Sequence, residues 1–289
     1  MPDPCPGGTD DPPHAVGLIT DSGRADAFLS CVTSCAVTLG WVPPRLNIHT
    51  DRLRANSFGG EARNYDTHRP RYPNQLIDDL LAGGARRILD VGAGTGIAAQ
   101  QLAQRGAEVL AVEPDARMAA IARQKGIPTE IDAFEAWDPA GRAFDLVVFA
   151  ASFHWVDPVV ALPKVRDILR ERGALALLWN RLTPTRPTPD DFAAIYRDYL
   201  DPDRLPGDGR FDEIAGAVSA AGYTVTQRWY PCDVHYSGQQ WLDWAFTHSN
   251  HLTLPVDRGA ELRRRLADRI GSDGVAVHAE ALAILASPA

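Results

Sequence analysis

The 289-residue sequence predicts an α/β fold built on a mostly parallel sheet, with an antiparallel pair of strands at one edge. From residue 75 to residue 180, apolar strand-like runs alternate with helix-like segments, which is typical of parallel strands joined by right-handed crossovers. The run 146–150 is apolar throughout, as in a strand that is covered on both faces. The strand at 87–91 continues into three glycines at alternate positions and then a helix, so a ligand could approach the bare backbone.

The elements of this core follow from local patterns. Glycines are expected to end its first, second and fourth helices. The expected strands are 87–91, 108–113, 129–132, 146–150 and 174–180. The expected helices are 75–82, 97–104, 116–124 and 159–170.

After Asn180 the character of the chain changes. Residues 183–189 are rich in Pro and Thr and predict a loop. Alternation predicts a strand at 223–230, and 275–285 is compatible with a last strand or, because of its alanines, with a helix. Further helices are expected at 191–200, 211–221, 238–247 and 258–270.

The chain is expected to contain one folded domain behind an N-terminal extension. Residues 1–54 open with Pro, Gly and Asp and show apolar patches without a clear period, which favours a disordered or loosely attached segment. A start codon placed too far upstream would leave the same pattern. The folded domain is expected at 55–289, with cap segments at about 183–210 and 236–272.

Composition narrows the classes of function. The net charge of −8 comes without clustered cations, which argues against a nucleic-acid partner. No apolar run reaches the roughly 18–20 residues of a membrane helix. The four cysteines are scattered, and Cys31 and Cys35 lack a second pair for zinc, so we expect free thiols, no metal and a cytoplasmic location. The oligomeric state is not indicated.

The glycine loop allows two interpretations. A dinucleotide-binding loop needs G-x-G-x-x-G; counted from Gly92 the last position is Ile97, although a looser form ending in Ala is met from Gly94. Asp90 stands two residues before the first glycine, where its carboxylate would repel a pyrophosphate and attract an ammonium group. Glu113 ends the second strand, where an acid can accept both hydroxyls of a ribose.

These residues resemble a known family. Asp-x-Gly-x-Gly-x-Gly followed by Glu113-Pro114 resembles the motifs of class I S-adenosylmethionine-dependent methyltransferases, and 58–73 and 153–157 resemble their small-molecule "type 11" branch. The resemblance runs from Phe58 to the C-terminus and is strongest between Ile88 and Trp179. It implies a Rossmann-like fold and methyl transfer from S-adenosylmethionine to an unidentified small molecule. The alternatives are an NAD-dependent oxidoreductase and a non-catalytic module that binds the cofactor.

The same resemblance implies which residues hold the cofactor. The glycine loop would pass under the methionine and ribose, Asp90 would face the ammonium group, and Glu113 would bind the ribose. Either Asp132 or the backbone amide of Phe134 would contact the adenine, and Arg69 would lie near the carboxylate. The full expected set is Tyr65, Arg69, Asp90, Gly92, Ala93, Gly94, Gly96, Glu113, Pro114, Asp132 and Phe134.

The acceptor side is less defined. His154 follows the fourth strand at the carboxyl edge of the sheet, where ligands bind in such folds. It could orient the acceptor, take its proton as a base, or only pack near the sulfonium. The aromatic and His-rich stretch 241–251 is typical of a core helix, and its functional alternative is a lid over the acceptor. Because this stretch lacks a Glu and a third ligand at useful spacing, we expect no metal there.

Overall fold

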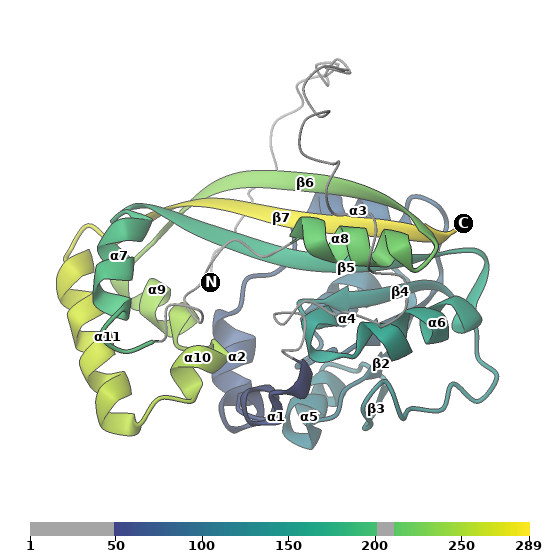
Figure 1. Ribbon diagram of the computed structural model, residues 1–289, viewed down its shortest axis with the longest axis horizontal. Coiled ribbons are helices and arrows are strands. Elements are labelled where there is room, and N and C mark those ends of the chain that lie inside the picture. The colour runs from purple at the N-terminus through teal and green to yellow at the C-terminus, as the bar shows by residue number, and fades with distance from the viewer. Residues whose placement is uncertain (1–48, 201–210) are drawn as a thin grey trace, which may run out of the picture.

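A seven-stranded sheet organises the computed structural model, which describes residues 49–200 and 211–289. The strand order is β3-β2-β1-β4-β5-β7-β6 (Figure 1). Strands β1 to β5 are parallel, and β7 runs antiparallel to both of its neighbours, β5 and β6. The strands are β1 Arg87–Val91, β2 Glu108–Val112, β3 Thr129–Glu130, β4 Phe144–Ala150, β5 Leu169–Arg186, β6 Tyr223–Tyr236 and β7 Val275–Pro288.

The expected α/β class is therefore confirmed, with the antiparallel strand β7 lying one place in from the edge. The helices are α1 Arg52–Ala55, α2 Ala62–His68, α3 Asn74–Leu81, α4 Ile97–Ala103, α5 Ala116–Gln124, α6 Pro158–Ile168, α7 Pro189–Tyr196, α8 Phe211–Ala220, α9 Gly238–Ala245, α10 Ser249–Leu252 and α11 Val256–Ile270. Within the described ranges, no helix combines the length and apolarity needed to cross a bilayer.

Two apolar clusters cover the two faces of the sheet. Successive residues of a strand point to opposite faces, so neighbouring residues of β1 join different clusters. Leu89 packs in the cluster that α6 and α8 cover, and Ile88 packs in the cluster that α3 and α4 cover. This double cover explains why residues 146–150 of β4 are all apolar.

Strand β5 is much longer than expected, and the predicted loop at 183–189 is wrong in its first half. Thr183 pairs with His278, and Pro184 pairs with Val277 of β7. The pairing of β5 with β4 ends at Leu178. Beyond that point β5 has a ladder partner on one side only in the described chain, and proline is tolerated on such an edge because it lacks an N–H.

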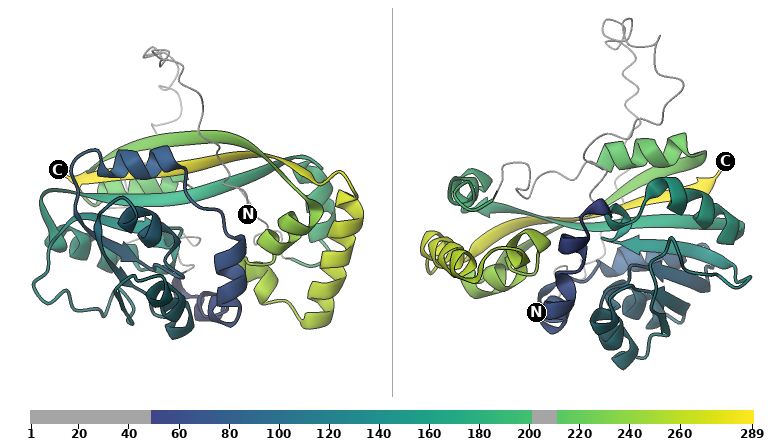
Figure 2. Two further views of the ribbon diagram at one scale, coloured as in Figure 1. Left: turned by 180° about the vertical axis from the view of Figure 1, so that it is seen from behind. Right: turned by 60° about the horizontal axis from the view of Figure 1, so that its bottom comes forward.

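The projecting ends of β5, β6 and β7 carry a separate group of helices, α7, α9, α10 and α11, which we call the cap (Figure 2). A third apolar cluster joins α7, α9 and α11 to these strands, with Phe192, Trp241, Leu262 and Val277 among its buried members. The helices of the two expected cap segments thus pack on each other. Part of the first segment, 201–210, lies outside the described residues, as do residues 1–48 of the expected extension.

Candidate active site

The glycine loop connects the carboxyl end of β1 to α4 through three glycines with positive φ. Their φ values are +63° at Gly92, +58° at Gly94 and +76° at Gly96, a region that side chains rarely adopt. A Cβ on Gly92 would lie 2.7 Å from the Cβ of Ser152, and one on Gly96 would lie 3.0 Å from that of Ala122. The packing of the fold therefore requires glycine at these two positions. The sequence predicted a different reason, which is that bare backbone lets a ligand approach the loop.

Asp90 is completely buried beneath this loop. Its Oδ2 accepts a hydrogen bond from the backbone N–H of Ala99 at 3.1 Å, while Oδ1 has no partner among the described residues. Burial, with a smaller contribution from the nearby carboxyl of Glu113, raises the pKa of Asp90 to about 7. A buried carboxylate oxygen without a donor is costly, so this position fits a ligand that brings a positive donor such as an ammonium group.

Glu113 joins the end of β2 to the same loop. Its Oε2 accepts from the backbone N–H of Gly94 at 2.8 Å, and its Oε1 accepts from that of Asp115 at 2.9 Å. Burial raises the pKa of this carboxyl as well. Each carboxylate oxygen can accept more than one hydrogen bond, so the two bonds hold Glu113 against the loop and leave lone pairs for ribose hydroxyls. Pro114, the next residue, is exposed.

The loop after β3 presents backbone rather than side chain. The ring of Phe134 is buried against Phe149 with centroids 5.6 Å apart, and its carbonyl accepts from Lys164 Nζ at 2.7 Å. Within the described ranges, no group accepts a hydrogen bond from the Phe134 amide. Asp132 is exposed and its carboxylate accepts from the Ala133 amide.

Arg69, at the end of α2, faces the cap. Its guanidinium lies 4.8 Å from the centre of the Tyr65 ring, and Nη2 donates to the carbonyl of Thr247 at 3.2 Å. Its Nε is buried and has no hydrogen-bond partner among the described residues. The sequence predicted that Tyr65 and Arg69 close over the cofactor; the structure joins them to each other and brings Arg69 to the loop between α9 and α10.

His154 lies at the edge of the sheet that the sequence predicted. It belongs to a short 3₁₀ turn, Phe153–Trp155, four residues after the end of β4. Ser152, two residues earlier, donates its hydroxyl hydrogen to the carbonyl of Val91 at the start of the glycine loop. Burial, together with the charges of Arg54 and Arg69, lowers the pKa of His154 to about 4. The ring is therefore neutral at physiological pH.

Two cap histidines face the same guanidinium. The Nδ1 of His248 lies 3.0 Å from the carbonyl oxygen of Ala245, and the Nε2 of His251 lies 3.2 Å from the hydroxyl of Tyr196. Burial and the charge of Arg69 lower the pKa of His251 to about 4 and that of His248 well below its usual value. The core interpretation of the stretch 241–251 is confirmed for Trp241, which packs in the cap core. A lid over the acceptor stays a prediction.

Sequence reasoning missed Arg54, which it placed in the extension. The Nη2 of Arg54 donates to the hydroxyl of Ser249 at 3.1 Å, and its guanidinium lies 6.0 Å from the ring of Trp155. Arg54 therefore links the cap to the turn that holds His154. No local pattern marks such a residue, because its partner is 195 positions away in the sequence.

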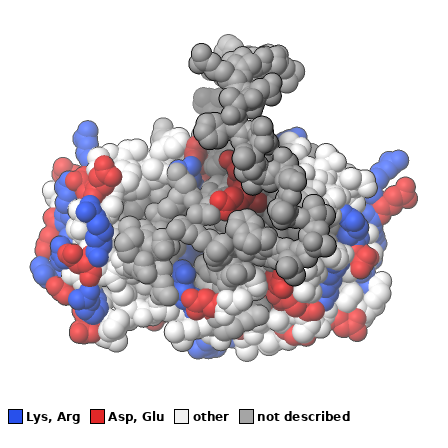
Figure 3. All heavy atoms as spheres, in the orientation of Figure 1, with Lys and Arg blue, Asp and Glu red and all other residues white. Residues whose placement is uncertain are grey.

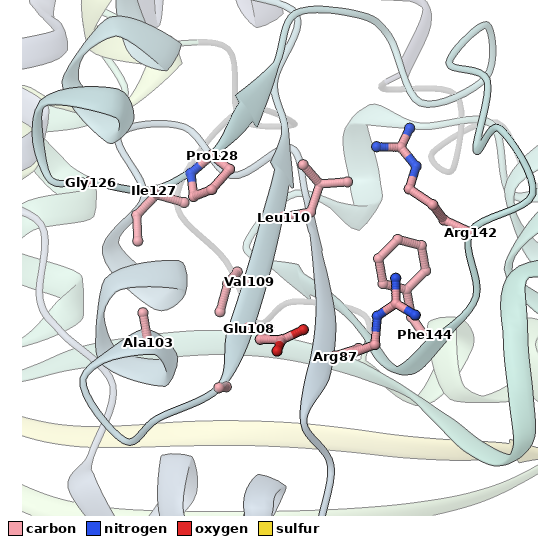
Figure 4. Close-up of a pocket in the computed structure, with 11 residues that line it drawn as sticks. Arg87, Ala103, Glu108, Val109, Leu110, Gly126, Ile127, Pro128, Arg142 and Phe144 are labelled. Carbon is pink, nitrogen blue, oxygen red and sulfur yellow. The ribbon is translucent and has the colours of Figure 1, made fainter.

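A cavity of about 400 Å³ lies at the amino ends of the parallel strands (Figure 4). It is bordered by Arg87, Glu108 and Phe144, which are the first residues of β1, β2 and β4. Ligands of open α/β sheets bind at the carboxyl ends of the strands. This cavity at the amino ends is therefore separate from the site around Asp90.

Surface charge gives little support for a polyanionic partner. On the face shown in Figure 3, basic and acidic side chains lie interspersed around α7 and α11. Arginines of α11 form ion pairs with acids in and just after α7. Arg269 pairs with Asp191 and Arg265 pairs with Asp198, both at 2.6 Å. Paired arginines of this kind do not form the unopposed basic stripe that nucleic acid requires.

The strand order, the glycine loop at the carboxyl edge and the acid that ends β2 define a Rossmann-like α/β protein with a nucleoside-binding edge. Residues 89–177 match the family model of a methyltransferase domain. This part of the chain, less than half of its length, is similar to the methyltransferase domain that this family model describes.

The relatives are consistent with this family. An uncharacterized methyltransferase of Mycobacterium tuberculosis is 39% identical over 127 residues, which are 43% of this chain and 52% of that protein. Trans-aconitate 2-methyltransferase of Mycobacterium ulcerans is 34% identical over 91 residues, 31% of this chain and 34% of that protein. The chain spans about half the length of the first of these relatives and a third of the second.

A solved structure shows the same fold. A protein from Anaeromyxobacter dehalogenans that is described as a type II methyltransferase superposes with a TM-score of 0.52 and 20% identity. The superposition covers 76% of this chain and 97% of that one. At this level of identity the likeness concerns the fold alone.

Proposed function

We propose that this protein transfers a methyl group from S-adenosylmethionine to a small-molecule acceptor, in the cytoplasm. The observation that carries the proposal is the buried oxygen of Asp90 without a partner, next to a glycine loop at the carboxyl edge of the sheet. An amino-acid ammonium would supply the missing donor, whereas the pyrophosphate of NAD would add negative charge beside this carboxylate.

The residues around the loop can be given roles toward the cofactor. Asp90 would bind the ammonium group, Glu113 beside Pro114 would bind the ribose hydroxyls, and the amide of Phe134 or the carboxylate of Asp132 would bind the adenine. The backbone of the loop would pass beneath the ligand. The loop residues in this role are Gly92, Ala93, Gly94 and Gly96.

When bound, S-adenosylmethionine supplies an electrophilic methyl group on a sulfonium. Displacement at such a carbon depends mainly on in-line alignment and on the exclusion of water. The cap and the turn at Phe153–Trp155 would provide both. Arg54 joins them, because it donates to Ser249 of the cap and lies over the ring of Trp155. A neutral His154 can contact the acceptor without repelling a sulfonium.

Calorimetric titration tests the proposal directly. The protein is expected to bind S-adenosylmethionine and its demethylated product S-adenosylhomocysteine, and to give no heat with NAD. Gly94→Val should abolish binding, because a branched side chain at φ +58° strains the loop and occupies the ligand side. Tight NAD binding without heat from either adenosyl compound would refute the proposal.

A further inference from the structure

One ammonium group binds three backbone carbonyls in the loop that joins β3 to β4. Lys164 lies on α6, and its Nζ donates to the carbonyl of Phe134 at 2.7 Å and to that of Glu135 at 3.3 Å. It also donates to the carbonyl of Trp137. A lysine ammonium has three donor hydrogens, so these bonds use every donor that Lys164 has.

The aromatic rings of the same segment also contact this ammonium group. Nζ of Lys164 lies 5.1 Å from the centre of the Phe134 ring and 5.7 Å from the centre of the Trp137 ring. A cation at such a distance is attracted to the face of an aromatic ring. Both rings are buried in the apolar cluster that α6 covers. Lys164 therefore holds this short segment by its backbone and by its side chains.

The carbonyls that are bound decide where the amides of the segment point. In a trans peptide the C=O and the N–H of one unit point in opposite directions, so the bond from Lys164 to the Phe134 carbonyl turns the Glu135 amide away from the ammonium group. The carbonyl of Ala133 accepts from two later amides of the turn, at 3.0 and 2.9 Å, and this turns the Phe134 amide outward. Neither outward amide has an acceptor among the described residues.

These two amides follow the strand that neighbours the ribose position. The amide of Glu113 donates to the carbonyl of Glu130 at 3.0 Å, which joins the end of β2 to the end of β3. The glycine loop after β1 lies on the other side of Glu113. A nucleoside whose ribose is bound by Glu113 and whose methionine lies on the glycine loop would therefore extend its base over β3, where the loop with the outward amides begins.

We propose that Lys164 is a positioning residue for the adenine of S-adenosylmethionine. By binding three carbonyls, it holds the amides of Phe134 and Glu135 toward the base, whose ring nitrogens accept hydrogen bonds. The inference rests on the proposed function and adds to it a residue that decides which base the site accepts. Lys164 acts through the loop and not through a contact of its own with the cofactor.

The test compares two ligands that differ only in the base. S-adenosylhomocysteine carries adenine, whereas its inosine analogue has a carbonyl in place of the amino group and a proton on the adjacent ring nitrogen. A ring nitrogen that carries a proton cannot accept from an amide. The unaltered full-length protein is therefore expected to bind the adenine ligand about 10- to 100-fold more tightly, as for one unmade hydrogen bond to a buried group. Calorimetry gives both dissociation constants.

Lys164→Met keeps the length of the aliphatic side chain and removes its ammonium group. We expect S-adenosylhomocysteine to bind about 10-fold more weakly while the affinity for the inosine analogue changes by less than about threefold, so that the preference for adenine falls. A residue that only stabilised the fold would weaken both ligands by the same factor. Glu113→Ala should show that second pattern, because both ligands carry the same ribose.

Lys125→Met is the matched control. Lys125 is the only other lysine of the sequence, and its ammonium group pairs with Asp66 of α2. We expect this variant to keep the preference for adenine although it also loses a partly buried ammonium group. If Lys164→Met does not melt cooperatively, Lys164→Gln replaces it. The glutamine amide has two donor hydrogens instead of three, and the preference should then fall by at least about threefold.

The outcomes separate this inference from the proposed function. An unchanged preference in Lys164→Met or in the variant that replaces it, an equal weakening of both ligands, or the same loss in Lys125→Met would overturn the inference. An unaltered protein that binds S-adenosylhomocysteine without distinguishing the two bases would overturn it as well. If the unaltered protein binds neither ligand, the proposed function itself fails.

Discussion

Two buried carboxyl groups flank the glycine loop, Asp90 from β1 and Glu113 from the end of β2. Asp90 and Glu113 each lose solvent, and burial raises the pKa of both. Backbone N–H groups of Ala99, Gly94 and Asp115 offset part of this cost. Oδ1 of Asp90 accepts no hydrogen bond from the described residues, and we therefore assign this oxygen to a ligand.

The role of Glu113 can be tested by removing its carboxylate. Glu113→Ala should weaken S-adenosylhomocysteine binding by about 1–3 kcal/mol, the usual cost of hydrogen bonds lost to a charged group. Calorimetry gives the dissociation constant, and a thermal melt confirms that the variant is folded. Glu108→Ala, at the exposed amino end of the same strand, is the control. An unchanged dissociation constant would remove Glu113 from the site.

The buried His251 should make stability depend on pH. Its pKa is about 4 in the fold and about 6.5 when unfolded, so between these values the unfolded chain binds a proton that the native chain does not. Its contribution to stability is therefore complete above pH 6.5 and is lost as the pH falls toward 4. Asp90 acts in the opposite direction, because its pKa is raised and its contribution is lost as the pH rises toward 7.

The contributions of His251 and Asp90 to the pH dependence of stability oppose each other. We therefore expect the contribution of His251 to be visible only when a His251 variant is compared with the unaltered protein. Urea unfolding at pH 7 and at pH 4.5 should show that His251→Asn loses less stability on acidification than the unaltered protein, by roughly 2 kcal/mol. Tyr196→Phe removes the hydrogen bond but keeps the ring buried, so it should retain most of the pH dependence. Equal pH dependence in all three proteins would contradict the assignment.

At the scale of elements, the three long strands decide how the site is enclosed. Strands β5, β6 and β7 continue past the parallel core and hold the cap over the carboxyl edge (Figure 2). The cap has its own apolar cluster, distinct from the two clusters on the faces of the sheet. Because the apolar clusters are separate, we expect that a substitution in the cap can lower the stability of the cap without disturbing the structure of the glycine loop.

Leu266→Ala tests that separation. Leu266 of α11 is fully buried, so its truncation should cost about 2–5 kcal/mol. Hydrogen exchange is expected to accelerate in α7, α9 and α11 while β1 and β2 keep their protection, and S-adenosylhomocysteine affinity should change by less than about threefold. Leu102→Ala in α4, behind the glycine loop, should instead weaken that affinity. Uniform loss of protection in Leu266→Ala would show a single cooperative unit.

At the scale of the whole molecule, few polar contacts join the cap to the rest of the site. Arg54 bonds to Ser249, and Arg69 bonds to the carbonyl of Thr247. Both arginines precede β1 in the sequence, while their partners follow β6. Hydrogen bonds between residues that are 178 and 195 positions apart thus join the cap to the segment before β1.

This arrangement gives a prediction for truncation. The three apolar clusters use residues between 72 and 286, so a chain that begins at 49 should fold cooperatively and bind S-adenosylhomocysteine. A chain that begins at 57 also lacks Arg54, so we expect the same cofactor affinity with slower methyl transfer. Circular dichroism melts and calorimetry measure both. Loss of a cooperative transition in the longer fragment would show that residues 1–48 belong to the domain.

The sequence by itself determined the parallel core and the glycine loop at the carboxyl ends of its strands. The strand at 87–91, the helix at 116–124 and the glycine loop were predicted to within a residue, because each depends on local patterns of apolar residues, caps and glycines. The position of His154 followed as well. Parallel strands end at a common edge, and only three residues separate Ala150 from His154.

The tertiary structure alone decided how the cap is attached to the parallel core. The extension of β5 through Thr183 and Pro184 depends on pairing with β7, about 94 residues later, and a Pro- and Thr-rich segment carries no local signal for it. The contacts of Arg54 and Arg69 with the cap likewise join residues more than 170 positions apart. Local sequence reports backbone preference, whereas the charge balance of a site depends on which distant residues the fold brings together.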